Sequence, residues 1–239
     1  MRAAGLDEWR YQLLPVPPQL FEETARALPG AGFAGANVTI PHKEAALRLA
    51  DEAGPEAAAI GAANTLTFTG DAIEADNTDA HGIVSSLPER PAGRRALVLG
   101  AGGSARAAVW GLLDAGAAEV MVLNRTPDRA RQLCSELGGR PVEDPEPADL
   151  LVNCTSVGLG GTADTFVALP LSPDDLGGFG CVVDLVYRPG GTELVSAARA
   201  RGVKTVDGLE VLVRQGALSF QRWTRREAPL EVMRRAAKT

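Results

Sequence analysis

The stretch ALVLGAGGSARAAVWGLL, residues 96–113, decides the fold. Its apolar start is typical of a strand buried on both faces of a parallel sheet, and an alanine-rich helical pattern follows it. Between the two lies a GxGxxA motif formed by Gly100, Gly102 and Ala105. Gly100 permits a tight turn, Gly102 lets the backbone approach a pyrophosphate, and Ala105 allows close helix packing. The alternative is a glycine-rich turn without a ligand, but the flanking strand and helix favour a dinucleotide site.

Strands and helices alternate on the C-terminal side of this stretch. The pattern predicts a Rossmann-type doubly wound sheet. The expected strands are 96–100, 119–124, 149–154, 181–186 and 204–208, and the expected helices include 127–137 and 192–202. A linker rich in proline, glycine and arginine, LPERPAGRR at 87–95, precedes this unit and marks a domain boundary.

The first part of the chain also alternates, with shorter elements. Strands are expected at 9–16, 35–40, 64–68 and 71–76, and helices at 19–28 and 43–53. The tail from 209 to 238 reads as two helices broken at Pro229 that pack back on the first unit. The sequence therefore predicts an α/β protein of two domains. Residues 1–81 with helices from 214–239 would form a substrate domain, and 82–213 a nucleotide domain.

The composition limits the class of protein. A chain of 239 residues with 45% hydrophobic residues can build real cores, and a net charge of −6 argues against a nucleic-acid or anionic-membrane surface. No apolar run approaches the length of a membrane helix, and the start lacks the apolar core of a signal peptide, so a cytoplasmic location is expected. Cys134, Cys154 and Cys181 are far apart and form no CxxC pair, which indicates neither a disulfide framework nor a metal site.

The choice of cofactor depends on the end of the second strand of the nucleotide unit. An NAD enzyme of this fold carries an acid there, whereas this chain has Asn124 and Arg125. An arginine grips a 2′-phosphate that a carboxylate would repel, so the cofactor is expected to be NADP(H). Thr126 can cap the next helix and donate its hydroxyl. Arg129 is either a second cation for the phosphate or a solvated charge, and Arg106 lies either over the adenine or in water.

A lysine and an aspartate are the candidates for proton transfer to a carbonyl substrate. Lys43 stands at the strand-to-helix corner of GANVTIPHKEAA, residues 35–46, where it is either a solvated charge or a proton donor over a pocket. Asp79 is its natural partner, although both Asp76 and Asp79 could simply cap a helix. The two histidines, His42 and His81, are expected to be structural.

A series of motifs over nearly the whole chain resembles shikimate dehydrogenase. They are NVTIPHK at 37–43, GAANTL at 61–66, DNTDAHG at 76–82, GAGGSARA at 100–107, NRT at 124–126, NCTSVG at 153–158, DLVYRPGGT at 184–192 and GLEVLVRQG at 208–216. The resemblance implies NADP-dependent reduction of 3-dehydroshikimate to shikimate, a step of aromatic amino acid biosynthesis. Shikimate or 3-dehydroshikimate would then be the small-molecule partner, and a homodimer is the expected assembly.

The resemblance also implies the site residues. Lys43 and Asp79 fall on the family's catalytic pair. The implied substrate contacts are Thr39, Lys43, Asn64, Asp79, Tyr187 and Gln215. A polyhydroxylated ring acid needs such donors and acceptors without excess charge. The implied cofactor contacts are Gly100, Ala101, Gly102, Gly103, Ser104, Ala105, Asn124, Arg125, Thr126 and Arg129, with Thr155, Ser156, Leu185 and Gly208 in addition.

The front of the chain departs from the family pattern. Family members begin with a strand and a loop that carries two serines for the substrate carboxylate, and MRAAGLDEWRYQLLPV supplies neither. RAAGL instead reads as the last turn of a helix closed by Gly5. The expectation is a chain that lacks an N-terminal segment and its substrate contacts.

Two other functions stay open at this point. One is a dehydrogenase of quinate or another hydroxylated ring acid. If such an enzyme used NAD, Arg125 would argue against it. The other is a non-catalytic dinucleotide-binding relative, which the presence of Lys43, Asp79 and Gln215 opposes.

Overall fold

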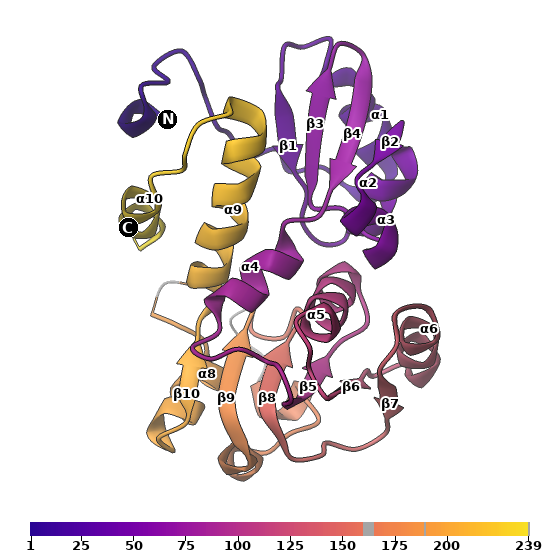
Figure 1. Ribbon diagram of the computed structural model, residues 1–239, viewed down its shortest axis with the longest axis vertical. Coiled ribbons are helices and arrows are strands. Elements are labelled where there is room, and N and C mark those ends of the chain that lie inside the picture. The colour runs from indigo at the N-terminus through magenta and orange to yellow at the C-terminus, as the bar shows by residue number, and fades with distance from the viewer. Residues whose placement is uncertain (160–164, 189, 239) are drawn as a thin grey trace.

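The computed structural model describes residues 1–159, 165–188 and 190–238. Its strands form two sheets that lie at opposite ends of the molecule, with helices α4 and α9 running between them (Figure 1). The first sheet has four strands in the order β1-β3-β4-β2, and the second has six in the order β10-β9-β8-β5-β6-β7. The α/β fold with two sheets agrees with the sequence prediction. The predicted domain limits of 1–81 with 214–239, and 82–213, stay a prediction, and Thr239 lies outside the described residues.

The first sheet is built around a hairpin. Strands β3 and β4 pair antiparallel from Thr65↔Asp76 to Thr69↔Ala72, and Gly70 turns between them with φ 62°. The elements of this part are η1 Arg2–Ala4, η2 Pro18–Leu20, α1 Phe21–Ala27, β1 Gly35–Asn37, α2 Lys43–Leu49, β2 Glu52–Ala53, α3 Pro55–Ile60, β3 Thr65–Thr69, β4 Ala72–Asp76 and α4 Asp79–Ser86. Helices α1 to α3 supply apolar side chains that cover this sheet.

Two predictions for this part were wrong. Residues 9–16 form no strand in the described chain, because Pro15 and Pro17 remove backbone donors and Leu13 is left 89% exposed. The helix predicted over 43–53 ends at Leu49. Asp51 instead exchanges hydrogen bonds with Ile73, which draws β2 alongside β4.

The second sheet is parallel throughout and carries helices on both faces. Its elements are β5 Arg95–Leu99, α5 Gly103–Asp114, β6 Glu119–Leu123, α6 Pro127–Leu137, β7 Arg140–Val142, β8 Ala148–Asn153, α7 Thr165–Ala168, η3 Pro173–Gly178, β9 Phe179–Asp184, α8 Glu193–Ala200 and β10 Lys204–Val206. One apolar cluster includes side chains of α5 and α6, and another includes side chains of η3 and α8. The strand order reverses between β5 and β8, which is where sheets of this kind bind ligands.

The tail consists of α9 Gly208–Thr224 and α10 Leu230–Ala237, which confirms two helices broken at Pro229. It returns to the first sheet as predicted. The Trp223 indole donates to the Leu66 carbonyl at 3.0 Å, and the Asn37 amide donates to the Ser219 hydroxyl at 2.8 Å. In the part of the chain that the structure covers, no helix has both the length and the apolarity that a membrane span requires.

Candidate functional site

Lys43 and Asp79 lie together between the two sheets, where helices α2, α4 and α5 begin. Lys43 is the first residue of α2 and Asp79 the first of α4, and Lys43 Nζ lies 2.8 Å from Asp79 Oδ2. The two side chains are only 12% and 9% exposed, respectively. Lys43 Nζ also donates to Ser104 Oγ of α5, again at 2.8 Å. The lysine is therefore a partly desolvated cation held by both parts of the molecule, and not a solvated surface charge.

Neighbouring amides fix the Asp79 carboxylate in turn. Asn64 Nδ2 donates to Asp79 Oδ1 at 2.9 Å, and Asn64 Oδ1 accepts the Thr78 backbone N–H at 2.8 Å, which sets the orientation of this amide. Asn77 Oδ1 accepts the N–H groups of Asp79 and Ala80. Asn77 thus caps α4, and Asp79 is left free to hold the lysine. The sequence did not identify Asn77 as this cap.

The network extends to α9 through Gln215. Its Oε1 accepts from Asn64 Nδ2 at 3.1 Å, and its Nε2 donates to the Leu212 carbonyl at 2.9 Å. Ser219, one turn on, bonds Thr65 Oγ1 at 2.8 Å. A Cβ on Gly82 would lie 2.8 Å from the Gln215 Cβ, so α4 and α9 approach closely here. Asn64, Asp79 and Gln215, three of the predicted substrate contacts, are brought together.

The other two predicted substrate contacts lie outside this network. Thr39 is exposed, and Tyr187 is 48% exposed. Tyr11 interacts electrostatically with Tyr187, and it donates its hydroxyl to Asn37 Oδ1 at 3.0 Å. Burial, and to a smaller extent Tyr187, raises the pKa of Tyr11. Sequence reasoning placed Tyr11 in a strand and gave it no role.

The glycine motif forms a turn open to a ligand. Gly100 has φ 107°, and a Cβ there would lie 3.3 Å from the Cys154 backbone, so only glycine suits this position. Gly102 has open space where its Cβ would be, and no side chain caps the N-terminus of α5. Ala101 is 9% exposed, and Ala105 is fully buried. The uncapped helix N-terminus fits an anion such as a pyrophosphate.

The residues after β6 form a polar corner. Asn124 Nδ2 donates to the Thr126 carbonyl at 2.9 Å, while Thr126 stands at the N-cap of α6 without the predicted side-chain cap. The Arg125 guanidinium is exposed and makes no hydrogen bond or ion pair within the described chain. Arg129 Nη2 lies 3.7 Å from Glu44 Oε1 of α2. Arg125 is therefore available for a phosphate, whereas Arg129 already faces a carboxylate.

A buried hydrogen-bond network supports the remaining predicted cofactor contacts. Asn153 Nδ2 donates to Asp184 Oδ1 at 2.9 Å, and Asn153 Oδ1 accepts from both the hydroxyl and the N–H of Thr155. Thr192 Oγ1 donates to Asp184 Oδ2 at 2.6 Å. Desolvation raises the pKa of Asp184, which is 1% exposed, although these hydrogen bonds oppose the rise. Sequence reasoning missed the part that Asn153, Asp184 and Thr192 play.

The last predicted cofactor contacts follow β8 and β9. Leu185 donates its N–H to the Asn153 carbonyl at 3.0 Å, and the Ser156 carbonyl accepts the Leu159 N–H at 3.1 Å. Gly208 begins α9, where a Cβ would lie 2.7 Å from the Leu185 carbonyl oxygen. Pro189, in the DLVYRPGGT motif, lies outside the described residues.

Several polar residues have structural roles. The Arg106 side chain does not simply face water, because its Nε donates to the Ile60 carbonyl and its Nη2 pairs with Glu136 at 2.7 Å. A place over the adenine stays a prediction. His42 stacks on Phe21, and His81 bonds Glu56, so the expectation of structural histidines holds. Asp76 pairs with Arg222 at 2.6 Å and caps no helix among the described residues.

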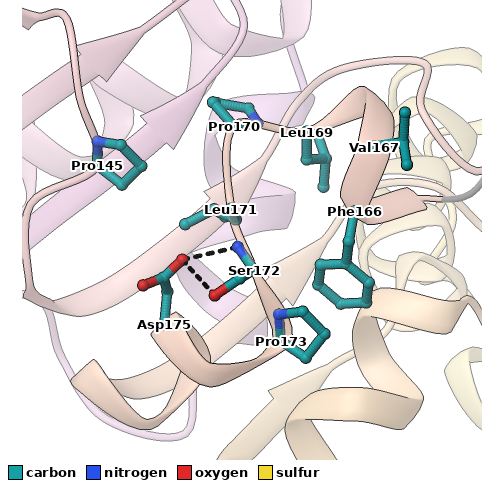
Figure 2. Close-up of a pocket in the computed structure, with 9 residues that line it drawn as sticks. All are labelled: Pro145, Phe166, Val167, Leu169, Pro170, Leu171, Ser172, Pro173 and Asp175. Carbon is teal, nitrogen blue, oxygen red and sulfur yellow. Dashed lines mark hydrogen bonds between the residues drawn. The ribbon is translucent and has the colours of Figure 1, made fainter.

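An open cavity of about 510 Å³ lies beside α7 and η3, and neither Lys43 nor Asp79 lines it (Figure 2). Apolar side chains line it, and Asp175 accepts hydrogen bonds from both the hydroxyl and the N–H of Ser172 at its rim. None of the predicted site residues lines this cavity. Among the described residues, no three His, Cys, Asp or Glu side chains form a group that could hold a metal ion.

Comparison with known proteins identifies the family. Family models match at residues 1–66 (shikimate dehydrogenase substrate binding domain), 83–155 (shikimate / quinate 5-dehydrogenase) and 208–238 (shikimate 5′-dehydrogenase C-terminal domain). A shikimate dehydrogenase (NADP(+)) of Moorella thermoacetica is 40% identical over 250 residues, which cover 98% of this chain and 84% of that protein. The chain belongs to the shikimate dehydrogenase family.

Other shikimate dehydrogenases are similar in sequence and in structure. The one of Methylobacterium radiotolerans is 46% identical over 230 residues, which cover 89% of this chain and 80% of that protein. The crystal structure of shikimate 5-dehydrogenase from Thermus thermophilus, in complex with NADP(H) and shikimate, matches with a TM-score of 0.81. It is 40% identical, and the match covers 93% of this chain and 85% of that one.

Proposed function

We propose that this shikimate dehydrogenase family member reduces 3-dehydroshikimate to shikimate with NADPH, with Lys43 as the proton donor and Asp79 as the group that orients it. The observation that carries the proposal is the contact of 2.8 Å between Lys43 Nζ and Asp79 Oδ2 in a partly desolvated corner. A lysine in such a place can work as an acid or base. The shikimate dehydrogenases to which the chain is 40% to 46% identical carry NADP(+) in their names, which supports the cofactor.

The residues present fit the cofactor. The uncapped start of α5 leaves backbone N–H groups for a pyrophosphate, and the open space at Gly102 leaves room for it. Arg125 has no partner in the described chain and suits a 2′-phosphate. The bound cofactor would supply the hydride.

The chain's own groups would handle the proton. The Lys43 ammonium has three N–H groups, and Asp79 and Ser104 accept two of them. The third has no partner among the described residues and would donate to the substrate oxygen as negative charge develops there. Asn64 and Gln215 lie beside Asp79 and would bond hydroxyls of the ring.

Turnover with shikimate and NADP tests this assignment. Lys43→Ala is expected to lower kcat by roughly 10²- to 10⁴-fold, with NADPH affinity near wild type. Asp79→Asn should act on the same step, so the double variant should be little slower than the slower single variant. Lys204→Ala removes an exposed lysine that pairs with Glu89 and serves as the control. Turnover of Lys43→Ala close to that of Lys204→Ala would refute the role of Lys43.

We also propose an assembly and a location. A homodimer follows only from the family resemblance, and sedimentation of the purified chain at several concentrations tests it. A cytoplasmic location is supported by the thiols of Cys134, Cys154 and Cys181, which form no disulfide. Fractionation of the source cells tests that location.

A further inference from the structure

Ser104 touches the catalytic lysine from the other side of the site. It is the second residue of α5, within the glycine motif, whereas Lys43 begins α2 beneath the first sheet. Lys43 Nζ lies 2.8 Å from Ser104 Oγ. In the described chain this is the one hydrogen bond that the Ser104 side chain makes. The hydroxyl hydrogen of Ser104 is therefore not committed to another acceptor there.

The contact is held by close packing. A Cβ on Gly103 would lie 2.7 Å from the Lys43 Cβ and 3.3 Å from its Cδ, so the lysine stem lies directly on the first turn of α5. The Lys43 side chain is only 12% exposed, so it has little room to adopt another conformation. The close packing of the first turns of α2 and α5 therefore sets the position of Lys43 Nζ relative to Ser104.

A hydroxyl and a carboxylate act differently on a lysine. An ionised Asp79 only accepts hydrogen bonds, so it holds the ammonium form. A hydroxyl both accepts and donates. When Lys43 gives a proton to the substrate oxygen, an N–H bond breaks, an O–H bond forms, and the neutral amine gains a lone pair. The Ser104 hydroxyl can then rotate and donate its hydrogen to that lone pair.

We propose that Ser104 is a positioning residue that keeps Lys43 aimed at the substrate oxygen in both protonation states of the lysine. This inference rests on the proposed function of Lys43 as the proton donor. The inference also links the cofactor loop to the catalytic lysine. Ser104, which positions the Lys43 amine, belongs to the turn that would receive the pyrophosphate. In the oxidation direction the same hydroxyl orients the neutral amine before it accepts the proton.

Ser104→Ala and Ser104→Thr separate the hydroxyl from the backbone. Ser104→Ala should lower kcat about tenfold in both directions, the cost of one hydrogen bond to a charged group. NADPH affinity, measured by fluorescence titration, should stay within about twofold, because the backbone N–H groups of the loop remain. Ser104→Thr keeps a hydroxyl and should restore most of kcat. The solvent deuterium isotope effect on kcat should rise in Ser104→Ala, since proton transfer becomes slower.

A control variant and a comparison with Lys43→Ala show which hypothesis a negative result contradicts. Ser135→Ala removes a hydroxyl that bonds a backbone carbonyl on α6 and should leave kcat unchanged. Wild-type kcat in Ser104→Ala would overturn the inference. The inference would also be overturned if kcat of Ser104→Thr were no higher than that of Ser104→Ala. The same holds if Ser104→Ala lowered NADPH affinity alone. If Lys43→Ala keeps its turnover, the proposed function itself fails. If Lys43→Ala is inactive while Ser104→Ala is normal, only the role of Ser104 fails.

Discussion

Arg129 of α6 and Glu44 of α2 form an ion pair, with 3.7 Å between Nη2 and Oε1. Glu44 directly follows Lys43, the proposed proton donor, and Arg129 lies one turn beyond the corner expected to bind the 2′-phosphate. The side chains are 58% and 42% exposed, so water screens the pair and its contribution is small. The pair shows that the Arg129 guanidinium faces a carboxylate, and its part in binding a phosphate stays a prediction.

Glu44→Gln is the first prediction. A phosphate at this corner would compete with Glu44 for Arg129, so removal of the carboxylate charge should tighten NADPH binding by roughly two- to fivefold. NADH lacks the phosphate, and its affinity should not change. Glu22→Gln, which removes an exposed charge on α1, is the control. Titration of both cofactors at low and moderate salt measures the effect, and equal changes for NADPH and NADH would contradict it.

Arg125→Asp is the second prediction. Arg125 makes no ion pair in the described chain, so its loss should leave the fold intact. Loss of a charge-assisted contact and the new repulsion should weaken NADPH binding by about tenfold or more, while NADH binding is spared. Arg26→Asp makes the same charge change on α1 and should affect neither cofactor. An unchanged ratio of the two dissociation constants would remove Arg125 from the phosphate site.

The buried strands explain why much of the fold was predictable. Helix α6 has the predicted ends Pro127 and Leu137, and strands β5, β6 and β8 lie within one residue of the predicted ranges. Each of these strands is an apolar run between turn residues, a pattern that burial in a parallel sheet dictates. β7 was missed because it has only three residues, one of them Pro141. The helical turns of α7 and η3 have no apolar period to reveal them.

The site was predictable only in part, for a physical reason. The corner positions of Lys43 and Asp79 suggested a pair, and the structure brings these residues together. No local pattern indicates that Ser104 faces Lys43, since the two are 61 positions apart and belong to different layers. Asp184 and Thr192 likewise meet through the end of β9 and the start of α8. Such contacts depend on tertiary packing, which sequence spacing does not encode.

Asp184 carries a prediction about pH. Burial raises its pKa above the ordinary value of 3.8, so the stability linked to this group is present at low pH and is lost as pH rises through the raised pKa. Asp184→Asn cannot ionise, and it can still accept from Asn153 and Val186 and donate to Thr192. The free energy of unfolding of this variant should therefore increase relative to that of the wild type as pH rises above the ordinary pKa of 3.8.

Urea unfolding at several pH values measures this difference. A difference that stays flat or falls as pH rises would contradict a raised pKa. Asp184→Ala is the contrasting variant, because it leaves the buried donors of Asn153 and Thr192 without an acceptor. It should destabilise the protein by about 1–3 kcal/mol at low pH, where the wild-type carboxyl is neutral. This deficit should shrink as pH rises, because the alanine variant also lacks the titrating group.

The neighbouring glycines Gly102 and Gly103 should affect different steps. A Cβ on Gly102 meets open space and no positive φ strains it, so Gly102→Ala should fold normally. Its methyl group would stand where the pyrophosphate approaches the backbone. We expect NADPH affinity to fall roughly tenfold, with little change in kcat at saturating cofactor.

Gly103→Ala should instead disturb Lys43, the proposed proton donor. The new Cβ would lie 2.7 Å from the Lys43 Cβ, closer than such atoms pack, with the Ala62 Cβ also in contact at 3.4 Å, so the lysine stem must move. A displacement of this size at a proton donor costs roughly tenfold to a hundredfold in kcat. NADPH affinity should change little, because Gly103→Ala keeps its backbone N–H. Fluorescence titration and steady-state kinetics on the two variants give both parameters. If both substitutions lowered only cofactor affinity, the turn would act on the cofactor alone, and the packing of Lys43 against α5 would have no part in turnover.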